Sequence, residues 1–200
     1  MQNHWDERYS GEEYIYGTEP NGFLKEQLPK LKPGRILFPA EGEGRNAVYA
    51  ATLGWKTDAF DQSVEGQKKA LQLAKNKGVS IDYEILALEN WNPEPDQYDC
   101  IALIFVHLPD GLRQQVHRAA IKALQPGGTL ILHAFTINQL PRTSGGPKTA
   151  ELLFSKELLE QDFKNIDLIE LKETQVELEE GQLHQGLADV VQLIGRKLKV

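Results

Sequence analysis

Hydrophobic and polar positions follow two different periods along this chain. The stretches between the strand-like segments repeat apolar residues every three or four positions, which predicts amphipathic helices. Short apolar runs typical of buried strands occupy residues 35–40, 55–60, 81–86, 98–106 and 129–135. This alternation of strands and helices indicates a mostly parallel sheet with helices on both of its faces.

The predicted helices begin and end at recognisable residues. The first ends at Gly54, and the second begins after the cap Ser63 and ends at Gly78. Asp110 and Ser155 are expected to cap the two later helices. Most of these helices directly follow a predicted strand, as the units of a parallel sheet require.

The C-terminal third predicts a different connection. Two β-like runs, 166–178 and 188–196, are joined by a stretch with two glycines, 179–187, that we interpret as a hairpin connection. Such a hairpin adds an antiparallel last strand to a parallel sheet. The expected fold is a single α/β domain, Rossmann-like and doubly wound, with a seven-stranded sheet and helices on both faces. Residues 1–32 form an N-terminal lid segment and 33–200 form the core.

Composition excludes several classes of protein. The 29 acidic and 22 basic residues give a net charge of -7, which argues against broad electrostatic binding to nucleic acid. The longest apolar run, 100–106, is far too short to span a membrane. One cysteine and five scattered histidines provide neither an internal disulfide nor metal-binding spacing, so we expect no metal site. No secretion signal is visible, so we expect a soluble cytoplasmic protein.

A glycine-rich turn between the first strand and the first helix is the strongest candidate for a ligand site. Residues 42–47 read Gly-Glu-Gly-Arg-Asn-Ala, the G-x-G-x-x-A spacing of dinucleotide sites. The glycines let a ligand approach the backbone, and the helix N-terminus offers N–H groups. Asp61 ends the second strand, where a carboxylate grips a ribose diol. The pattern therefore predicts a ligand that contains adenosine.

Charge on this turn narrows the choice of ligand. Glu41 and Glu43 flank Gly42, and a pyrophosphate would meet two carboxylates there. S-adenosylmethionine carries adenosine, an ammonium group and a sulfonium but no phosphate, so it fits better. Two alternatives stay open: an NAD(P)-dependent oxidoreductase, and a non-catalytic protein that binds an adenosyl ligand.

The same residues carry a resemblance to a known family. Segment 35–47, Asp61 and segment 124–128 together resemble the class I S-adenosylmethionine-dependent methyltransferases. Gly-Arg-Asn at 44–46 and His-Leu-Pro at 107–109 are similar to the tellurite-resistance and thiopurine methyltransferase-like branch. The N-terminal Trp-Asp-Glu-Arg-Tyr and Tyr-Gly-Thr-Glu-Pro-Asn sequences are similar to that branch as well. The resemblance implies methyl transfer to a small-molecule acceptor, with a thiol or a chalcogen oxyanion as candidates.

The resemblance also implies which residues contact the cofactor. The family's acidic residue before the glycines falls on Phe38, so Glu41 is the candidate partner of the methionine ammonium. The expected contacts at the methionine end, the ribose, the adenine, the methyl side and the N-terminal lid are Glu41, Gly42, Gly44, Asn46, Asp61, Gln62, Ser63, Ala87, Leu88, Phe105, Val106, Tyr16 and Arg8.

Among the histidines, His107 is the catalytic candidate. It follows the apolar strand 98–106, and its unperturbed pKa suits proton transfer near neutral pH. It either deprotonates or orients the acceptor, or it only hydrogen-bonds the backbone. His184 is expected to be a solvated loop residue, and His117 and His133 are expected to play no part in the site, His117 as a helix surface position.

The acceptor pocket is expected to lie between three segments. These are the N-terminal aromatic residues of 5–16, the long irregular loop 136–149 and the connection 179–187. The aromatic residues either close over the cofactor as a lid or pack an N-terminal helix on the core.

Overall fold

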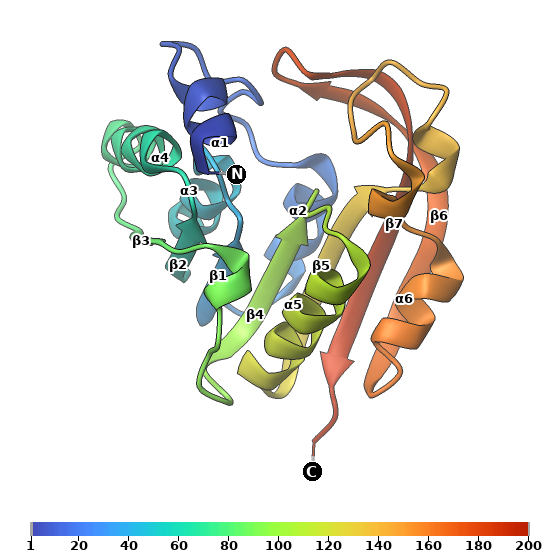
Figure 1. The fold of residues 1–200 in the computed structure, drawn as a ribbon. Coiled ribbons are helices and arrows are strands. Elements are labelled where there is room, and N and C mark those ends of the chain that lie inside the picture. Colours follow the sequence, from blue (N-terminus) through green and yellow to red (C-terminus); the bar gives the residue numbers. More distant parts are fainter. Residues whose placement is uncertain (1, 200) are drawn as a thin grey trace.

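The computed structural model describes residues 2–199, which form one mixed sheet flanked by helices (Figure 1). Within this range the sheet has seven strands in the order β3-β2-β1-β4-β5-β7-β6. The first five strands pair in parallel, and β7 and β6 pair antiparallel to their neighbours. The strands are β1 (Arg35–Pro39), β2 (Lys56–Asp61), β3 (Asp82–Ile85), β4 (Tyr98–Ile104), β5 (Leu124–Phe135), β6 (Ile166–Glu180) and β7 (His184–Lys197). The predicted fold class is confirmed.

Helices cover both faces of this sheet. Helices α2, α3 and α4 pack over one face, around Phe38, while α5 and α6 pack over the other, around Leu103. The α-helices are α1 (Gln2–Tyr9), α2 (Gly22–Gln27), α3 (Arg45–Thr52), α4 (Val64–Asn76), α5 (Asp110–Ala123) and α6 (Lys156–Asp162). Short 3-10 helices are η1 (Leu28–Lys30), η2 (Leu88–Asn90), η3 (Ile137–Gln139) and η4 (Ala150–Leu152). No helix among the described residues is both long and apolar enough to cross a membrane.

The predicted caps of α4 and α6 are confirmed by their hydrogen bonds. The Ser63 hydroxyl accepts the Gly66 N–H at 3.0 Å, and the Ser155 hydroxyl accepts the Leu158 N–H at 3.2 Å. Asp110 differs from its prediction because it is the first residue of α5 rather than the cap. Its carboxylate instead lies 2.6 Å from the guanidinium of Arg113, one turn along the helix.

The hairpin β6–β7 is longer than the sequence pattern predicts. The two strands pair as far as Glu180 and His184, so only residues 181–183 form the connection. The prediction of a connection over 179–187 was wrong because this part of the hairpin projects beyond its neighbours and lacks the apolar alternation of a buried strand. At the tip, the N–H of Gln182 donates to the carbonyl of Ile15 at 2.8 Å.

The N-terminal segment lies above the carboxyl ends of the parallel strands. Helix α1 packs against α4, and the Ser63 hydroxyl donates to the Asp6 carboxylate at 2.6 Å. The chain then crosses to the tip of the β6–β7 hairpin before it enters α2; Figure 1 shows the blue segment and the red hairpin tip on the same side of the sheet. The segment therefore covers the edge of the sheet at which open α/β proteins bind ligands.

Candidate functional site

The turn between β1 and α3 adopts a left-handed backbone at three positions. Ala40 has φ 54°, Gly42 has φ 61° and Gly44 has φ 88°. A Cβ on Gly44 would lie 2.7 Å from the Cα of Ala70, so a larger residue would force α4 away from the turn. The glycine at 44 is therefore required both by the backbone and by close packing.

Asp61 joins the end of β2 to this turn. Its Oδ2 accepts the Gly42 N–H at 3.1 Å, and its Oδ1 accepts the Ser63 N–H at 2.9 Å. Burial raises the pKa of this carboxyl above its ordinary value, and the backbone donors oppose that rise. Each carboxylate oxygen retains a further lone pair that can accept a ligand hydroxyl.

The carboxylate of Glu41 caps the N-terminus of α3. Its Oε1 accepts the N–H groups of Asn46 and Ala47, each at 2.7 Å. Burial raises the pKa of Glu41 to about 7 despite these donors. A pyrophosphate bound at a helix N-terminus needs these same backbone N–H groups, so Glu41 occupies the position that such a ligand would take.

Glu43 points away from the turn, contrary to the expectation that it would confront a phosphate. Its carboxylate lies 2.8 Å from the Lys69 ammonium and accepts the Ile15 N–H at 2.9 Å. The Glu43 carboxylate is therefore paired with a cation of α4, and it also holds the N-terminal segment through the backbone of Ile15. The sequence could not place Lys69 beside it, because Glu43 lies in the turn before α3 and Lys69 lies 26 residues later in α4.

Two tyrosines enclose the turn. The Tyr83 hydroxyl donates to the Gly42 carbonyl at 2.6 Å. Tyr9 is buried, and its hydroxyl lies 2.6 Å from the position that a Cβ on Gly42 would occupy. Trp5 stacks on Tyr9 with ring centroids 5.5 Å apart. Tyr9 meets the expectation that the N-terminal aromatics pack on the core, and a lid over the cofactor stays a prediction.

The predicted adenine contacts lie along one edge of the sheet. Gln62, Ala87 and Leu88 are partly exposed just after β2 and β3. Ser63 is buried, and its hydroxyl is engaged by the α4 N-terminus and by Asp6. The structure thus brings these residues near Asp61. The Ser63 hydroxyl, however, is already used in hydrogen bonds with Gly66 and Asp6.

The residues after β4 form an aromatic cluster. Phe105 adopts φ 54°, which ends the strand, and Val106 is buried in the core. The Phe105 ring centroid lies 4.5 Å from that of Phe135 and 4.7 Å from that of His184. This cluster lies at the carboxyl end of β4, where the methyl side of the site is expected.

His107 has both ring nitrogens engaged by the backbone. Its Nδ1 lies 2.7 Å from the Leu152 carbonyl, and its Nε2 accepts the Phe135 N–H at 3.3 Å. Burial lowers the pKa of His107 to about 4. The predicted role as a base stays a prediction, and this geometry favours the alternative in which the ring fixes the backbone around the site.

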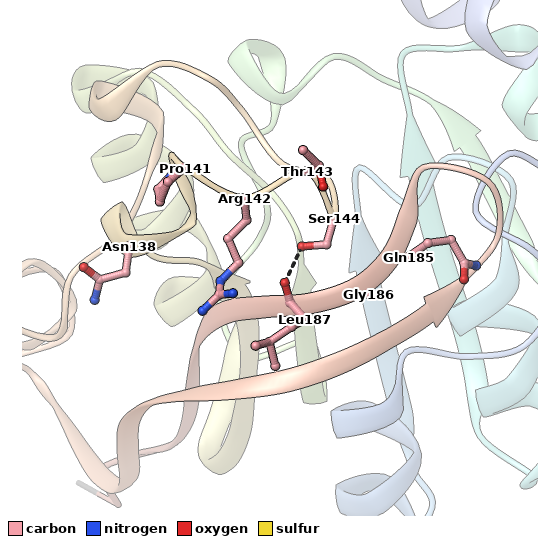
Figure 2. Close-up of a pocket in the computed structure, with 8 residues that line it drawn as sticks. All are labelled: Asn138, Pro141, Arg142, Thr143, Ser144, Gln185, Gly186 and Leu187. Carbon is pink, nitrogen blue, oxygen red and sulfur yellow. Dashed lines mark hydrogen bonds between the residues drawn. The ribbon is translucent and has the colours of Figure 1, made fainter.

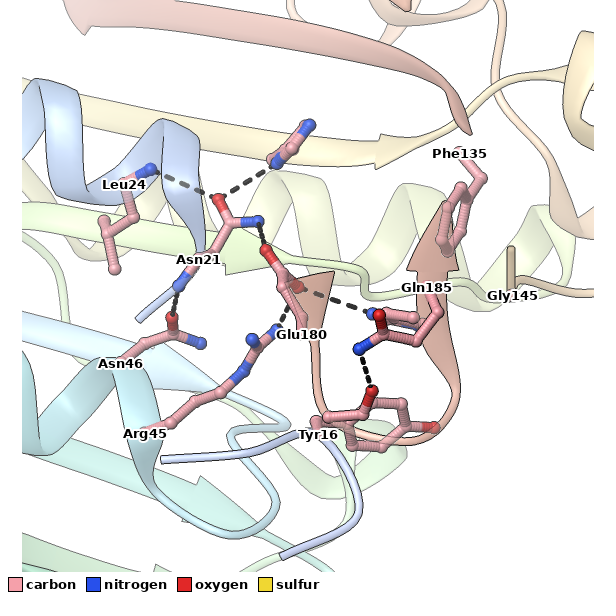
Figure 3. A network of polar contacts seen from close by, with 12 residues as sticks. Tyr16, Asn21, Leu24, Arg45, Asn46, Phe135, Gly145, Glu180 and Gln185 are labelled. Atoms are coloured by element: carbon pink, nitrogen blue, oxygen red, sulfur yellow. Dashed lines mark hydrogen bonds and ion pairs between the residues drawn. The ribbon is translucent and has the colours of Figure 1, made fainter. Parts of the chain in front are cut away.

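A buried polar network lies beside the aromatic cluster (Figure 3). Glu180 accepts from Arg45 Nη2 at 2.7 Å and from Asn21 Nδ2 at 2.8 Å, and its Oε2 lies 3.5 Å from His184 Nδ1. Asn21 Oδ1 lies 2.9 Å from His133 Nδ1. Sequence reasoning missed Glu180, Arg45, Asn21 and His133, since no short-range pattern links them.

His184 and His117 differ most from their predictions. His184 is only 6% exposed rather than solvated, because the strand β7 begins at this residue and the ring of Tyr16 packs 4.7 Å from its ring. His117 is buried between α5 and α6, with Nδ1 2.7 Å from Asp162 Oδ2, rather than on the helix surface.

The two N-terminal residues predicted to touch the cofactor lie on the His184 side of the site. Arg8 Nη1 donates to the Tyr16 hydroxyl at 3.1 Å, and its guanidinium also lies over the Trp5 ring. Asn46, in turn, uses its Oδ1 to accept the Asn21 N–H at 2.9 Å. The N-terminal segment and the start of α3 are thus joined by the side chain of Asn46, a residue of the predicted site.

A cavity of about 460 Å³ opens between the 136–149 loop and the β6–β7 hairpin (Figure 2). The Ser144 hydroxyl donates to the Leu187 carbonyl at 2.7 Å and joins the two walls. The cavity is lined by Asn138, Pro141, Arg142, Thr143, Ser144, Gln185, Gly186 and Leu187. Two of the three segments expected to build the acceptor pocket therefore meet here.

Comparison with known proteins bears on the class of the enzyme. Residues 36–128 match the family described as a methyltransferase domain. This segment contains the glycine turn, Asp61 and the strand that leads to Phe105. The match agrees with the predicted methyltransferase class and with S-adenosylmethionine as its cofactor.

Curated relatives match part of the chain. The ubiquinone biosynthesis O-methyltransferase of Xanthomonas campestris pv. campestris (strain B100) is 32% identical over 114 residues. The matched part covers 56% of this chain and 46% of that relative, so the chain spans less than half of the relative's length.

Solved structures match nearly the whole chain in fold. TehB from Haemophilus influenzae has a TM-score of 0.74 at 16% identity and covers 98% of this chain and 66% of its own. The N-methyltransferase NodS from Bradyrhizobium japonicum WM9 has a TM-score of 0.70 at 14% identity, with 98% of both chains covered. A structure described as concerning the conversion of a disulfide bond into a thioacetal group during echinomycin biosynthesis has a TM-score of 0.82 at 14% identity, with 99% of this chain and 92% of that chain covered. These likenesses establish a fold shared with methyltransferases.

Proposed function

We propose that the chain is an S-adenosylmethionine-dependent methyltransferase that acts on a small molecule. The observation that carries the proposal is the position of Glu41 within a segment that matches methyltransferase domains. Its carboxylate accepts the hydrogen bonds of the Asn46 and Ala47 N–H groups, which a pyrophosphate would otherwise accept. A dinucleotide is therefore disfavoured, and a ligand with adenosine and a positive charge is favoured.

The residues around the glycine turn fit this cofactor. Asp61 keeps lone pairs for the ribose hydroxyls, and Gln62, Ala87 and Leu88 lie partly exposed at the adjacent edge. The left-handed residues Gly42 and Phe105 reverse the chain just after β1 and β4, at the sheet edge where we place the methionine end. When bound, the cofactor supplies a methyl group already activated by its sulfonium.

The protein's own contribution is orientation and exclusion of water. We propose that residues 1–32 act as a lid over the core 33–200, with Tyr9 above the turn and Tyr16 beside the aromatic cluster. His107 fixes the backbone on both sides of the cluster through Leu152 and Phe135. Positioning of this kind supplies much of the acceleration in a direct displacement.

We propose that the acceptor enters through the cavity between the 136–149 loop and the hairpin. Its volume of about 460 Å³ suits a small molecule rather than a macromolecule. Sulfur and chalcogen acceptors follow from the sequence resemblance, and the relatives named O-methyltransferases add hydroxyl acceptors. We therefore propose an acceptor with a hydroxyl, thiol or chalcogen oxyanion group.

Two measurements test this function. Calorimetry should detect S-adenosylhomocysteine binding and no comparable heat with NAD or NADP. Radiolabelled methyl transfer should then be measured with phenols, catechols, thiols and selenite. Tighter binding of NAD than of S-adenosylhomocysteine would overturn the proposal. Cofactor binding without transfer to any acceptor would favour the non-catalytic alternative instead.

A further inference from the structure

A second histidine occupies the aromatic cluster and has no part in the function proposed so far. His184 begins β7, is almost fully buried, and lies among the rings of Phe105, Phe135 and Tyr16 at centroid distances of 4.7, 5.3 and 4.7 Å. Phe105 directly follows β4, next to the expected position of the methyl group. His184 therefore faces the reacting region rather than the bulk solvent.

The two ring nitrogens of His184 have different surroundings. Nδ1 lies 3.5 Å from Glu180 Oε2, and a carboxylate at that place favours the tautomer with the proton on Nδ1. Within residues 2–199 no protein hydrogen bond engages Nε2. In His107, by contrast, both nitrogens are engaged. His184 thus keeps a lone pair for a ligand proton.

Hydrogen bonds from buried side chains hold the Glu180 carboxylate in place beside His184. Its two oxygens accept from Arg45 and Asn21, and both partners are buried. The Arg45 guanidinium and His184 hold the pKa of Glu180 down to about 2, so the carboxylate stays ionised. A fixed, charged carboxylate behind an imidazole is the arrangement that orients a histidine base.

Other charged and titratable groups of several elements interact with His184. They are Glu180 on β6, Arg45 on α3, Arg8 on α1, His133 on β5 and His107 after β4. Burial lowers the pKa of His184, Glu180 opposes this, and both arginines add to the lowering. The ring is therefore neutral at neutral pH and able to accept a proton.

The loop that walls the cavity also contacts this ring. Gln185, which lines the cavity, directly follows His184, and Gly145 lies beside the lining residue Ser144. A Cβ on Gly145 would lie 2.6 Å from Cδ2 of His184, so the loop passes directly against the imidazole. The same Cβ would lie 3.3 Å from Nε2, so the Nε2 edge of the ring faces this loop.

We propose that His184 is the base that accepts the proton of a hydroxyl or thiol acceptor, and that Glu180 is its positioning residue. This inference rests on the proposed function. The acceptor oxygen or sulfur forms a bond to the methyl carbon while its proton passes to Nε2 of His184. The electron pair of the broken carbon–sulfur bond stays on the donor's sulfur, and the proton later leaves to solvent.

The first test reads the ring itself and needs no activity. In the protein labelled with ¹⁵N-histidine, the His184 signals are assigned by their loss in His184→Gln. At neutral pH they should report a proton on Nδ1 and none on Nε2, and Glu180→Gln should shift this preference. A proton on Nε2 in the wild type at neutral pH would overturn the inference.

The second test uses substituted phenols and benzenethiols of graded acidity as acceptors. His184→Gln should lower kcat by about 10²-fold for the least acidic acceptors, and the loss should shrink as the acceptors become more acidic. Glu180→Gln should show a smaller loss in the same pattern, and the acidic limb of the pH profile should move with it. Affinity for S-adenosylhomocysteine should stay near the wild-type value in both variants.

The matched control is Glu173→Gln, which makes the same change seven residues away at an exposed position of β6, outside the proposed acceptor pocket. It should leave turnover and the pH profile unchanged. Equal losses for all acceptors in His184→Gln, or a loss below about threefold for all, would overturn the role of base while leaving the methyltransferase intact. A wild type that neither binds S-adenosylhomocysteine nor transfers methyl would overturn the proposed function and this inference together.

Discussion

The side-chain amide of Asn21 donates to Glu180 Oε1 at 2.8 Å, although the two residues are 159 positions apart in sequence. This bond joins the segment that precedes α2 to the tip of the last hairpin. Arg45 reaches the same carboxylate from the start of α3 at 2.7 Å. Three parts of the chain that form the candidate site thus meet at one buried charge.

Removal of Arg45 should therefore be costly. Arg45→Met leaves the buried Glu180 carboxylate without its cation, and the free energy of unfolding should fall by about 3–5 kcal/mol. Urea denaturation measures this loss. The double variant Arg45→Met with Glu180→Leu should recover much of it, because no buried charge then lacks a partner. A double variant no more stable than the single one would contradict this account.

Substitution of Gly44 should separate backbone strain from steric conflict. Gly44→Ala places a Cβ 2.7 Å from Ala70 Cα at φ 88°, and it should cost well over 2 kcal/mol of the free energy of unfolding. Gly54 is the matched control, since it has φ 86° with nothing within 4 Å of a Cβ. Gly54→Ala should cost only about 1–2 kcal/mol, the conformational part alone. Thermal denaturation compares the two, and equal losses would rule out the close packing of α4.

Asp61 should be needed for cofactor affinity. Asp61→Ala removes the acceptor proposed for the ribose hydroxyls, so affinity for S-adenosylhomocysteine should fall by about 1.5–3 kcal/mol in calorimetry. The variant also loses the bonds to Gly42 and Ser63, so its stability must be followed alongside. Asp82→Ala, an exposed aspartate at the start of the neighbouring β3, should change neither quantity. Unchanged affinity in a folded Asp61→Ala protein would exclude the proposed ribose contact.

The pH dependence of stability should reveal the buried state of His107. Its pKa is lowered to about 4 in the folded protein, whereas an unfolded histidine titrates near 6.5. The folded state therefore binds fewer protons than the unfolded state between these values, and its stability falls as the pH drops from about 6.5 to about 4. Between pH 7 and 4.5 the wild type should lose about 2 kcal/mol more than His107→Gln.

The same variant tests the catalytic prediction for His107. If the ring only fixes the backbone, turnover in His107→Gln should fall by less than about tenfold and the acidic limb of the profile should persist. Loss of that limb together with a fall of about 10²-fold would instead establish His107 as the base. Comparison of acceptors with different acidity identifies any limb that belongs to the acceptor itself.

Local patterns were sufficient for most of the fold. The apolar runs placed the parallel strands, and Ser63 and Ser155 marked helix starts because capping depends on neighbouring backbone. The glycine spacing and Asp61 located one half of the candidate site for the same reason. Each of these signals lies within a few residues of the structure that it predicts.

The other half of the site depends on contacts that no local pattern encodes. His184 looked like a loop residue because its neighbours are polar, yet the N-terminal segment and the 144–146 loop bury it. The sequence suggested that Glu43 belongs to a ligand site, but its carboxylate lies 2.8 Å from the Lys69 ammonium. In both cases the partner lies far away in sequence, so the environment is set by tertiary packing.

The contact between Ile15 and Gln182 has a consequence for biosynthesis. A ribosome releases residues 10–21 long before it makes the hairpin that receives them, so the early segment has no docking surface while the middle of the chain folds. Asn21 and Arg45 also lack their shared partner, Glu180, until that hairpin is made. Docking of the N-terminal segment therefore follows synthesis of the β6–β7 hairpin, and a nascent chain halted before β6 would leave this edge of the sheet uncovered and open to a chaperone.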